Sequence, residues 1–171
     1  MSLIARLMLP LVQLGGGGGI FLILPYSPSD ACDLTLDPNT AYRGLSLSED
    51  NRKVTWVGED QSYPDHPDRF DSWLQVLGRE ALTGRCYWEV ERKGDVEIGV
   101  TYRGITRRGR GRDSGLGWNN KSWSLYCDDH RYSAWYNGRG TVLPLRPAGS
   151  TRVGVYLDRP MIIYKQVNTV M

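Results

Sequence analysis

One segment combines a nucleophile with neighbouring polar groups. Asp113-Ser114-Gly115 matches the core of the nucleophile segment of trypsin-like serine proteases. In that chemistry a histidine must lie within hydrogen-bond reach of the serine and act as its general base. Arg112 and Leu116 replace the glycines that flank the protease pattern, and the only histidine upstream of the serine is His66, which lies between two prolines. We therefore interpret Ser114 as part of a polar turn.

Metal and cofactor chemistry has little support either. His66 and His130 are the two histidines, and neither has a cysteine or carboxylate at the spacing of a zinc site. Asp128-Asp129 lacks the further oxygen ligands and the glycine of a calcium loop. The sequence also contains no GxSxG, HExxH, Walker or Rossmann motif. We expect no metal, no cofactor and no enzymatic activity.

The strongest local charge is a run of arginines interleaved with glycines. They stand at positions 103, 107, 108, 110 and 112. Such a segment is able to bind RNA or another polyanion, in which case binding should depend steeply on salt. No aromatic residue interleaves with the arginines, which favours a solvated loop between two strands instead. A basic loop that binds protein lies between these two interpretations.

The composition sets the class of protein in which these residues must be positioned. The chain has 171 residues, a formal charge of +2, 40% hydrophobic and 11% aromatic residues. These values fit one folded domain and exclude a disordered, collagenous or coiled-coil chain. The near-neutral balance argues against wholesale nucleic-acid binding. Twenty glycines and nine prolines indicate many turns, so we expect an all-β domain.

The three cysteines bear on the compartment. Cys32, Cys86 and Cys127 are too few and too widely spaced for a disulfide-rich secreted framework. We interpret them as three reduced thiols and predict a cytoplasmic protein. The single glycosylation sequon, Asn120-Lys121-Ser122, would matter only in a secreted chain.

The first thirty residues differ from the rest. Leu3 to Pro25 is apolar apart from Arg6 and Gln13, and it is interrupted by five glycines, Gly15 to Gly19. The length approaches that of a membrane span, but the glycines weaken a helix. A signal peptide is a second interpretation, although no clear cleavage site follows. We predict a leader over residues 1–30 that does not belong to the fold. The alternative is a membrane-tethered or secreted module, in which only residues 3–24 would contact the membrane.

From Cys32 onward the pattern predicts short strands separated by turns. The expected strands are Leu45–Leu47, Lys53–Val57, Trp88–Glu91, Ile98–Tyr102, Ser122–Cys127, Tyr132–Tyr136 and Val153–Leu157. Asp128 to Arg131 is expected to form the four-residue turn of a hairpin. No apolar pattern of helical period is sustained after Pro38, so a β-sandwich or barrel is predicted. Tryptophans inside strands should pack in the core, whereas Trp118, in a Gly/Asn-rich stretch, is a loop anchor or a binding residue.

Several motifs occur in the order found in PRY/SPRY (B30.2-type) domains, which this chain resembles from about Cys32 to Pro160. The PRY-like motifs are Leu36 to Ala41, Leu45 to Ser48, Asn51 to Val54, and Phe70 to Trp73 with Val76 to Gly78. The SPRY-like motifs are Thr83 to Glu91, Glu97 to Val100, Leu116 to Asn119, Lys121 to Leu125 and Val153 to Asp158. The chain is most similar to members found in fish tripartite-motif and NOD-like receptor proteins.

The resemblance implies a bent antiparallel β-sandwich, with a PRY segment over residues 31–80 and a SPRY segment over 81–171. It implies a non-enzymatic module that binds a protein partner, whose identity stays open, through loops at one end of the sandwich, in innate-immune or ubiquitin-ligase-type architectures. Carried over residue by residue, the partner surface includes Tyr102, Arg103, Tyr126, Asp128, Asp129 and Arg131. Ubiquitin-ligase activity in the family derives from an upstream RING domain, and this chain has no such cysteine/histidine array.

The sequence departs from the family after Asp158-Arg159-Pro160. The family continues there with further strands, whereas this chain has Met161 to Val167 and then only four residues. We expect Met161 to Val167 to supply at most one strand and the sandwich to be truncated at its C-terminus. Missing strands would leave unpaired backbone edges and an exposed apolar face.

Overall fold

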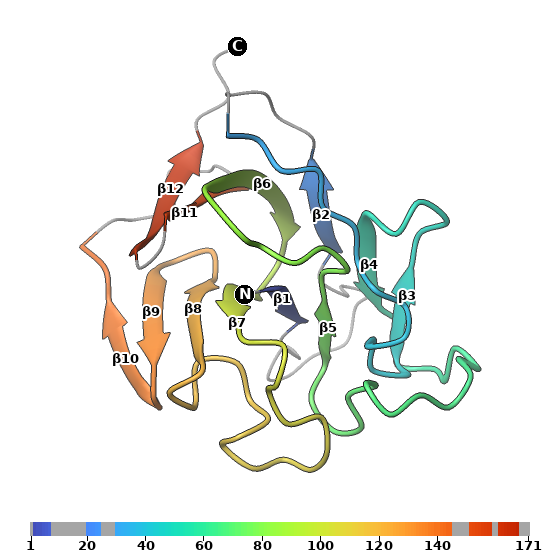
Figure 1. Cartoon of the computed structure of the whole chain (residues 1–171). Helices are drawn as coiled ribbons and strands as arrows, with labels where there is room; N and C mark the ends of the chain where they lie inside the picture. Colours follow the sequence, from blue (N-terminus) through green and yellow to red (C-terminus); the bar gives the residue numbers. More distant parts are fainter. Residues whose placement is uncertain (1, 8–19, 25–29, 145–150, 159–160, 168–171) are drawn as a thin grey trace.

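A computed structural model describes residues 2–7, 20–24, 30–144, 151–158 and 161–167 (Figure 1). These residues form strands and no helix. The strands are β1 (Ser2–Leu7), β2 (Ile20–Leu24), β3 (Leu45–Leu47), β4 (Lys53–Trp56), β5 (Gln75–Leu77), β6 (Cys86–Lys93), β7 (Val96–Thr101), β8 (Ser122–Cys127), β9 (Tyr132–Tyr136), β10 (Arg139–Val142), β11 (Arg152–Asp158) and β12 (Met161–Val167).

The strands form two sheets of six. One has the order β10-β9-β8-β7-β1-β5 and the other the order β12-β11-β6-β2-β4-β3, and neighbouring strands pair antiparallel throughout. In Figure 1 the first order runs from β10 at the left to β5, and the second runs in an arc from β12 at the upper left, through β6 and β2, to β3 at the right. The predicted all-β sandwich is therefore confirmed.

All seven strands expected after Cys32 are present, with small differences in their bounds. Leu45–Leu47, Ser122–Cys127 and Tyr132–Tyr136 form strands with the predicted bounds. Asp128 to Arg131 joins β8 to β9 as a hairpin, with Cys127 opposite Tyr132. The sequence missed β5 and β10, which are only three and four residues long and carry no clear alternation.

The N-terminal strands correct the expectation that residues 1–30 lie outside the fold. β1 lies between β5 and β7, and β2 lies between β4 and β6, so both are interior strands. A short apolar run is consistent with a buried strand, and periodicity alone does not distinguish such a strand from part of an apolar helix. The glycine run and residues 8–14, on which the leader interpretation also rested, lie outside the described residues.

The main core lies between the two sheets. Trp88 on β6 is 1% exposed, and Val96, Ile98 and Val100 on β7 are completely buried. A second, smaller core contains Phe70, Leu77, Ile105 and Leu116. Phe70 precedes β5, and Ile105 and Leu116 belong to the segment between β7 and β8, so this second core holds the arginine-containing loop against the segment that precedes β5.

A disulfide bond joins Cys32 to Cys86, which overturns the prediction of three reduced thiols. The backbone explains the pairing, because Cys32 N–H donates to Tyr87 O (2.9 Å) and Tyr87 N–H donates to Asp30 O (2.8 Å). These bonds place the two Cα atoms 5.4 Å apart, within disulfide reach. The two cysteines are 54 residues apart in the sequence, so their spacing carried no sign of the pairing. Cys127 is a free, buried thiol.

The C-terminal strand agrees with the sequence. Met161–Val167 forms β12, which pairs antiparallel with β11 along its whole length, from Met161 opposite Asp158 to Val167 opposite Arg152. It is the one strand that this segment was expected to supply. Among the described strands, β12 and β3 are the edges of one sheet and β10 and β5 the edges of the other.

Candidate binding site

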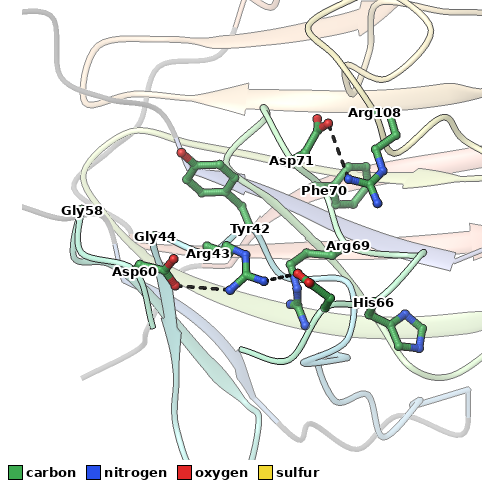
Figure 2. Close-up of a pocket in the computed structure, with 11 residues that line it drawn as sticks. Tyr42, Arg43, Gly44, Gly58, Asp60, His66, Arg69, Phe70, Asp71 and Arg108 are labelled. Atoms are coloured by element: carbon green, nitrogen blue, oxygen red, sulfur yellow. Dashed lines mark hydrogen bonds and ion pairs between the residues drawn. The ribbon is translucent and has the colours of Figure 1, made fainter. Parts of the chain in front are cut away.

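A pocket of about 320 Å³ opens beside the start of β3 (Figure 2). Ten of its lining residues come from the segments that surround β3 and β4 and precede β5, and one comes from the loop after β7. The lining residues are Tyr42, Arg43, Gly44, Gly58, Asp60, Asp65, His66, Arg69, Phe70, Asp71 and Arg108. The wall therefore combines two aromatic rings with three arginines and three aspartates.

Arg69 holds the floor of this pocket together. The residue is 5% exposed, and its guanidinium donates to Pro38 O (2.8 Å), Ala41 O (2.8 Å) and Pro64 O (2.7 Å). Burial lowers the pKa of the Arg69 guanidinium, and nearby Arg43 lowers it further. Because arginine is the most basic side chain, Arg69 stays protonated and supplies donors to two chain segments.

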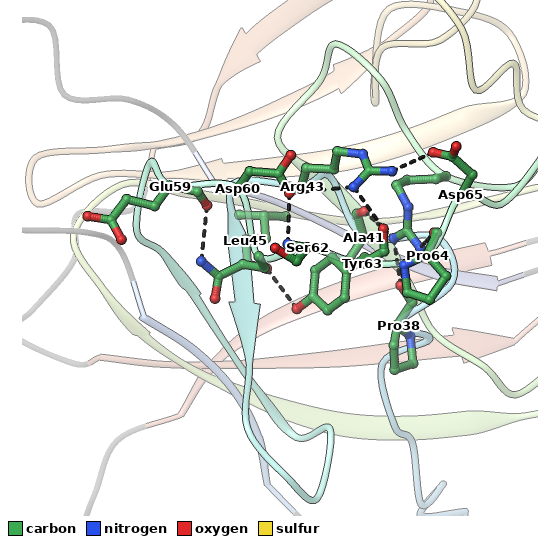
Figure 3. A network of polar contacts seen from close by, with 12 residues as sticks. Pro38, Ala41, Arg43, Leu45, Glu59, Asp60, Ser62, Tyr63, Pro64 and Asp65 are labelled. Atoms are coloured by element: carbon green, nitrogen blue, oxygen red, sulfur yellow. Dashed lines mark hydrogen bonds and ion pairs between the residues drawn. The ribbon is translucent and has the colours of Figure 1, made fainter.

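Arg43 organises the opposite wall (Figure 3). It donates to Tyr63 O (2.7 Å) and forms ion pairs with Asp65 (2.5 Å) and Asp60 (3.5 Å). The Tyr63 hydroxyl donates to Leu45 O (2.9 Å), which ties this network to β3. Asp60 and Asp65 have strongly exposed side chains, so these ion pairs lie at the mouth of the pocket, where a partner can reach them.

The remaining wall comes from the loop between β7 and β8. The Arg107 guanidinium lies over the Phe70 ring, 5.0 Å from its centre, and Arg108 lies 3.9 Å from the Asp71 carboxylate. Asp71 accepts hydrogen bonds from the Ser72 hydroxyl (2.8 Å) and Gly109 N–H (2.8 Å). The Ser72 bond, the Gly109 bond and Arg108 together hold the pKa of Asp71 below its usual value. Among the described residues, Arg108 is thus a cation at the pocket rim whose ion pair, with Asp71, is long.

Within the described residues, the other arginines of the loop differ in how many contacts they make. Arg103 donates to Arg79 O (3.3 Å) and lies 3.7 Å from Asp37, and Arg112 donates to Asn137 O (3.2 Å). Arg107 also donates to Arg103 O (2.8 Å), whereas Arg110 makes no described contact. Three of the five arginines, Arg103, Arg107 and Arg112, therefore donate hydrogen bonds that hold the loop in place, as expected for a loop between two strands.

Two residues of the predicted partner surface lie at this loop. Tyr102 and Arg103 directly follow β7, and Tyr102 is 51% exposed. The Tyr102 ring makes an edge contact with Trp123 (6.1 Å between centres), and Trp123 stacks on Tyr136 (5.2 Å). The Arg107 guanidinium donates to Arg103 O and packs on Phe70 of the pocket wall, so Arg107 links the start of this loop, with Tyr102 and Arg103, to the pocket. We call the pocket with Tyr102 and Arg103 the pocket face.

The other four predicted residues form a separate group at the β8–β9 hairpin. Asp128 Oδ1 accepts from the backbone N–H groups of His130 (2.7 Å) and Arg131 (2.8 Å), and Asp128 Oδ2 pairs with the Arg131 guanidinium (3.4 Å). Asp129 pairs with Arg92, which is only 4% exposed (3.1 Å). These contacts are those of an ordinary, well-ordered turn.

Tyr126 belongs to the same hairpin group. Its hydroxyl donates to Asp95 Oδ2 (3.2 Å). Burial, and after it the negative charge of Asp95, raises the pKa of Tyr126 to about 12. Tyr126 is therefore a neutral hydrogen-bond donor that links β8 to the β6–β7 turn.

The sandwich keeps the two groups of predicted residues apart. Thr101, just before Tyr102, pairs with Ser122, whereas Cys127, just before the hairpin turn, pairs with Val96 at the other end of the same two strands. Five residue steps separate these pairs, or about 17 Å at the usual strand rise. The structure therefore does not bring the six residues together in one surface.

The remaining sequence motifs have structural roles. The buried Ser114 hydroxyl accepts from Trp73 Nε1 (3.1 Å) and lies 2.8 Å from Gly109 O, as expected for a turn. Trp118 stacks on Trp135 (5.5 Å), which makes it a loop anchor. The described residues contain no group of three or more His, Cys, Asp or Glu arranged to hold a metal ion. Nor does that part of the chain include a helix long and apolar enough to span a membrane.

Sequence reasoning missed the pocket residues as a site. Phe70-Asp71 belongs to one of the PRY-like motifs, but no sequence pattern marked Arg69 or Arg43 as site residues. Their partners lie 17 to 31 residues away along the chain, apart from Pro64, which is 5 residues away. The one signal in the sequence was a cluster of charged residues that also contains His66, Phe70 and two prolines. Such a cluster is typical of an irregular surface segment.

Comparisons with known proteins agree with this architecture. The sequence model of the SPRY-associated domain (PRY) matches residues 34–82. The chain is 42% identical over 136 residues to tripartite motif-containing protein 16 of Mus musculus, which covers 76% of this chain and 24% of that protein. Among solved structures, stonustoxin superimposes with a TM-score of 0.73 at 37% identity and covers 85% of this chain and 25% of that one.

A second solved structure matches at the scale of a single domain. The PSpry domain of TRIM65 superimposes with a TM-score of 0.66 at 25% identity, covering 81% of this chain and 80% of that one. By contrast, this chain spans about a quarter of the length of the tripartite-motif protein and of stonustoxin.

Proposed function

Because this chain carries a PRY/SPRY domain, we propose that it is a non-enzymatic recognition module that binds a protein partner through the pocket face. The observation that carries this proposal is the composition of the pocket wall. The PRY segment and the loop after β7 meet there, and the exposed charges of Asp60, Asp65 and Arg108 surround the half-buried Tyr42 ring. Interfaces gain most of their affinity from a few aromatic and arginine anchors in such settings. The PRY boundary near residue 80 and the SPRY segment from 81 are part of the same proposal.

Three side chains are proposed as the contact residues. Arg108 is strongly exposed, and Tyr102 and Arg103 are about half exposed, so a partner can bury all three without unfolding the loop. The hairpin group of Tyr126, Asp128, Asp129 and Arg131 lies at the other end of β7 and β8, and its carboxylates are used by the turn. We therefore assign partner binding to Tyr102 and Arg103 among the predicted residues.

The test is a quantitative capture of partners from cells by the whole chain, with two matched variants. Tyr102→Ala/Arg108→Ala changes only exposed side chains of the pocket face, and Arg131→Ala changes an exposed side chain of the hairpin. We expect at least one captured protein to fall about tenfold or more with the first variant and to be unchanged with the second. Loss of all partners with the hairpin variant alone would contradict the proposal.

A second candidate function places the same module on a membrane-tethered or secreted protein. Two observations favour it: the stonustoxin relative is a toxin by name, and Cys32 and Cys86 form a disulfide. Disulfides persist in oxidising compartments and are rare in the cytosol. The argument for a cytoplasmic protein rested on three reduced thiols, and the disulfide removes that argument.

A further inference from the structure

Two adjacent asparagines on the turn before β8 have opposite environments. The Asn119 side chain donates to Arg112 O, Asp113 O and Gly115 O, and its Oδ1 accepts from Lys121 N–H and the Ser122 hydroxyl. Asn120 is exposed, and its side chain makes none of the hydrogen bonds found among the described residues. Asn120 is also the asparagine that stands in the sequon Asn120-Lys121-Ser122. The only sequon in the chain thus coincides with an exposed asparagine on a turn.

The disulfide is an independent observation that concerns the same compartment. N-linked glycans are attached where disulfides form, in the secretory pathway, and acceptor sites lie on surface loops. From the exposed Asn120 and the Cys32–Cys86 disulfide together, we infer that this domain matures in the secretory pathway and carries an N-linked glycan on Asn120. The inference does not depend on the pocket face, so either one can fail without the other.

The chemistry is a glycosyl transfer with a lipid-linked oligosaccharide as donor. A bond forms between the Asn120 side-chain nitrogen and the anomeric carbon of the sugar, and the bond from that carbon to the donor's pyrophosphate oxygen breaks. The lipid pyrophosphate leaves, and the amide nitrogen loses one proton. The cell's oligosaccharyltransferase catalyses this step. In the same compartment the two cysteine thiols give up two protons and two electrons to a disulfide-carrying oxidoreductase.

The folded structure also constrains when this transfer takes place. The Ser122 hydroxyl is buried, donates to Asn119 Oδ1 (3.0 Å) and accepts from Gly117 N–H (2.9 Å). The sequon serine is therefore out of reach once β8 has formed, and the glycan must be added to the nascent chain. The exposed position of Asn120 then lets the domain fold with the glycan in solvent.

The experiment expresses the chain in cultured vertebrate cells, with and without a foreign secretion signal at its N-terminus. We expect a form whose mobility increases on treatment with peptide N-glycosidase, and whose Asn120 is converted to Asp by that enzyme. Asn120→Gln should abolish this form. Lys121→Arg, which keeps the sequon, and Asn39→Gln, an exposed asparagine outside any sequon, should both retain it.

Thiol alkylation in denaturant without reductant gives the second readout. A formed disulfide leaves one alkylated cysteine per chain, Cys127, whereas a reduced chain has three. Three alkylated cysteines, or no glycosidase-sensitive form, would overturn the inference. The form with the secretion signal tests the two observations separately: no modification of that form refutes the acceptor, and three alkylated cysteines in it refute the disulfide.

Discussion

Replacing Arg69 by alanine should cost about 3–5 kcal/mol of unfolding free energy. The guanidinium donates to three backbone carbonyls, one of them fully buried, from two separate segments. A hydrogen bond from a charged donor contributes about 1.5–3 kcal/mol, so three bonds give an upper sum of about 4.5–9 kcal/mol. Water can reach the two partly buried carbonyls in the variant, which lowers the expected loss to the stated range.

The assay is urea unfolding of the purified chain, followed by tryptophan fluorescence, with ΔG and m measured separately. Arg69→Lys should recover little, because a lysine ammonium cannot reach three carbonyls in the geometry of a guanidinium. Arg110→Ala removes an exposed arginine without described contacts and should change ΔG by no more than about 0.5 kcal/mol. A loss below about 1 kcal/mol for Arg69→Ala would show that Arg69 does not hold the pocket floor.

Three further predictions use the same purified chain. Gly99→Ala should lower the unfolding free energy in urea by about 3 kcal/mol or more, because its Cβ would lie 2.2 Å from Trp123 O. Gly104→Ala, which has open space around it, should leave the unfolding free energy nearly unchanged. Equal effects of the two substitutions would contradict this reasoning. Ala5→Pro should cost about 3 kcal/mol or more in the same assay if β1 is an interior strand, and nothing if residues 1–30 lie outside the fold. In an ultraviolet titration, Tyr126 should ionise near pH 12. Because its pKa in the folded state exceeds the usual value of 10, its contribution to stability is complete below pH 10 and is lost as the pH rises toward 12. Tyr126→Phe should remove both the titration step and this pH dependence.

The sandwich could be predicted from sequence because its strands are specified by local patterns. Alternation over Ser122–Cys127 and Tyr132–Tyr136, with a polar turn between them, leaves one register for that hairpin. The short strands β5 and β10 lack such a pattern, and only their neighbours define them. β10 is exposed along its whole length, so no burial requirement shaped its sequence.

The candidate site was much less predictable, for a physical reason. The pocket depends on bonds between an arginine and backbone carbonyls such as Pro38 O and Ala41 O, and any residue type supplies a carbonyl. The sequence shows that an arginine donor is present, but it does not show which backbone carbonyls accept its hydrogen bonds. The six residues carried over from the family were placed by motif alone, and the length of β7 and β8 divides them between two ends of the sandwich.

The N-terminal segment shows how one composition fits three physical states. A continuous apolar run satisfies a membrane span, a signal peptide and an interior strand equally well, because all three remove apolar side chains from water. What separates them is the partner of the backbone N–H and C=O groups: a helix satisfies them within itself, and an interior strand satisfies them with its neighbours. In this structure β1 pairs with β5 and β7, and β2 pairs with β4 and β6. Removing either strand from its sheet therefore leaves two neighbouring strands without their backbone hydrogen-bond partners. Insertion of this segment into a membrane and completion of both sheets are therefore mutually exclusive states of one molecule.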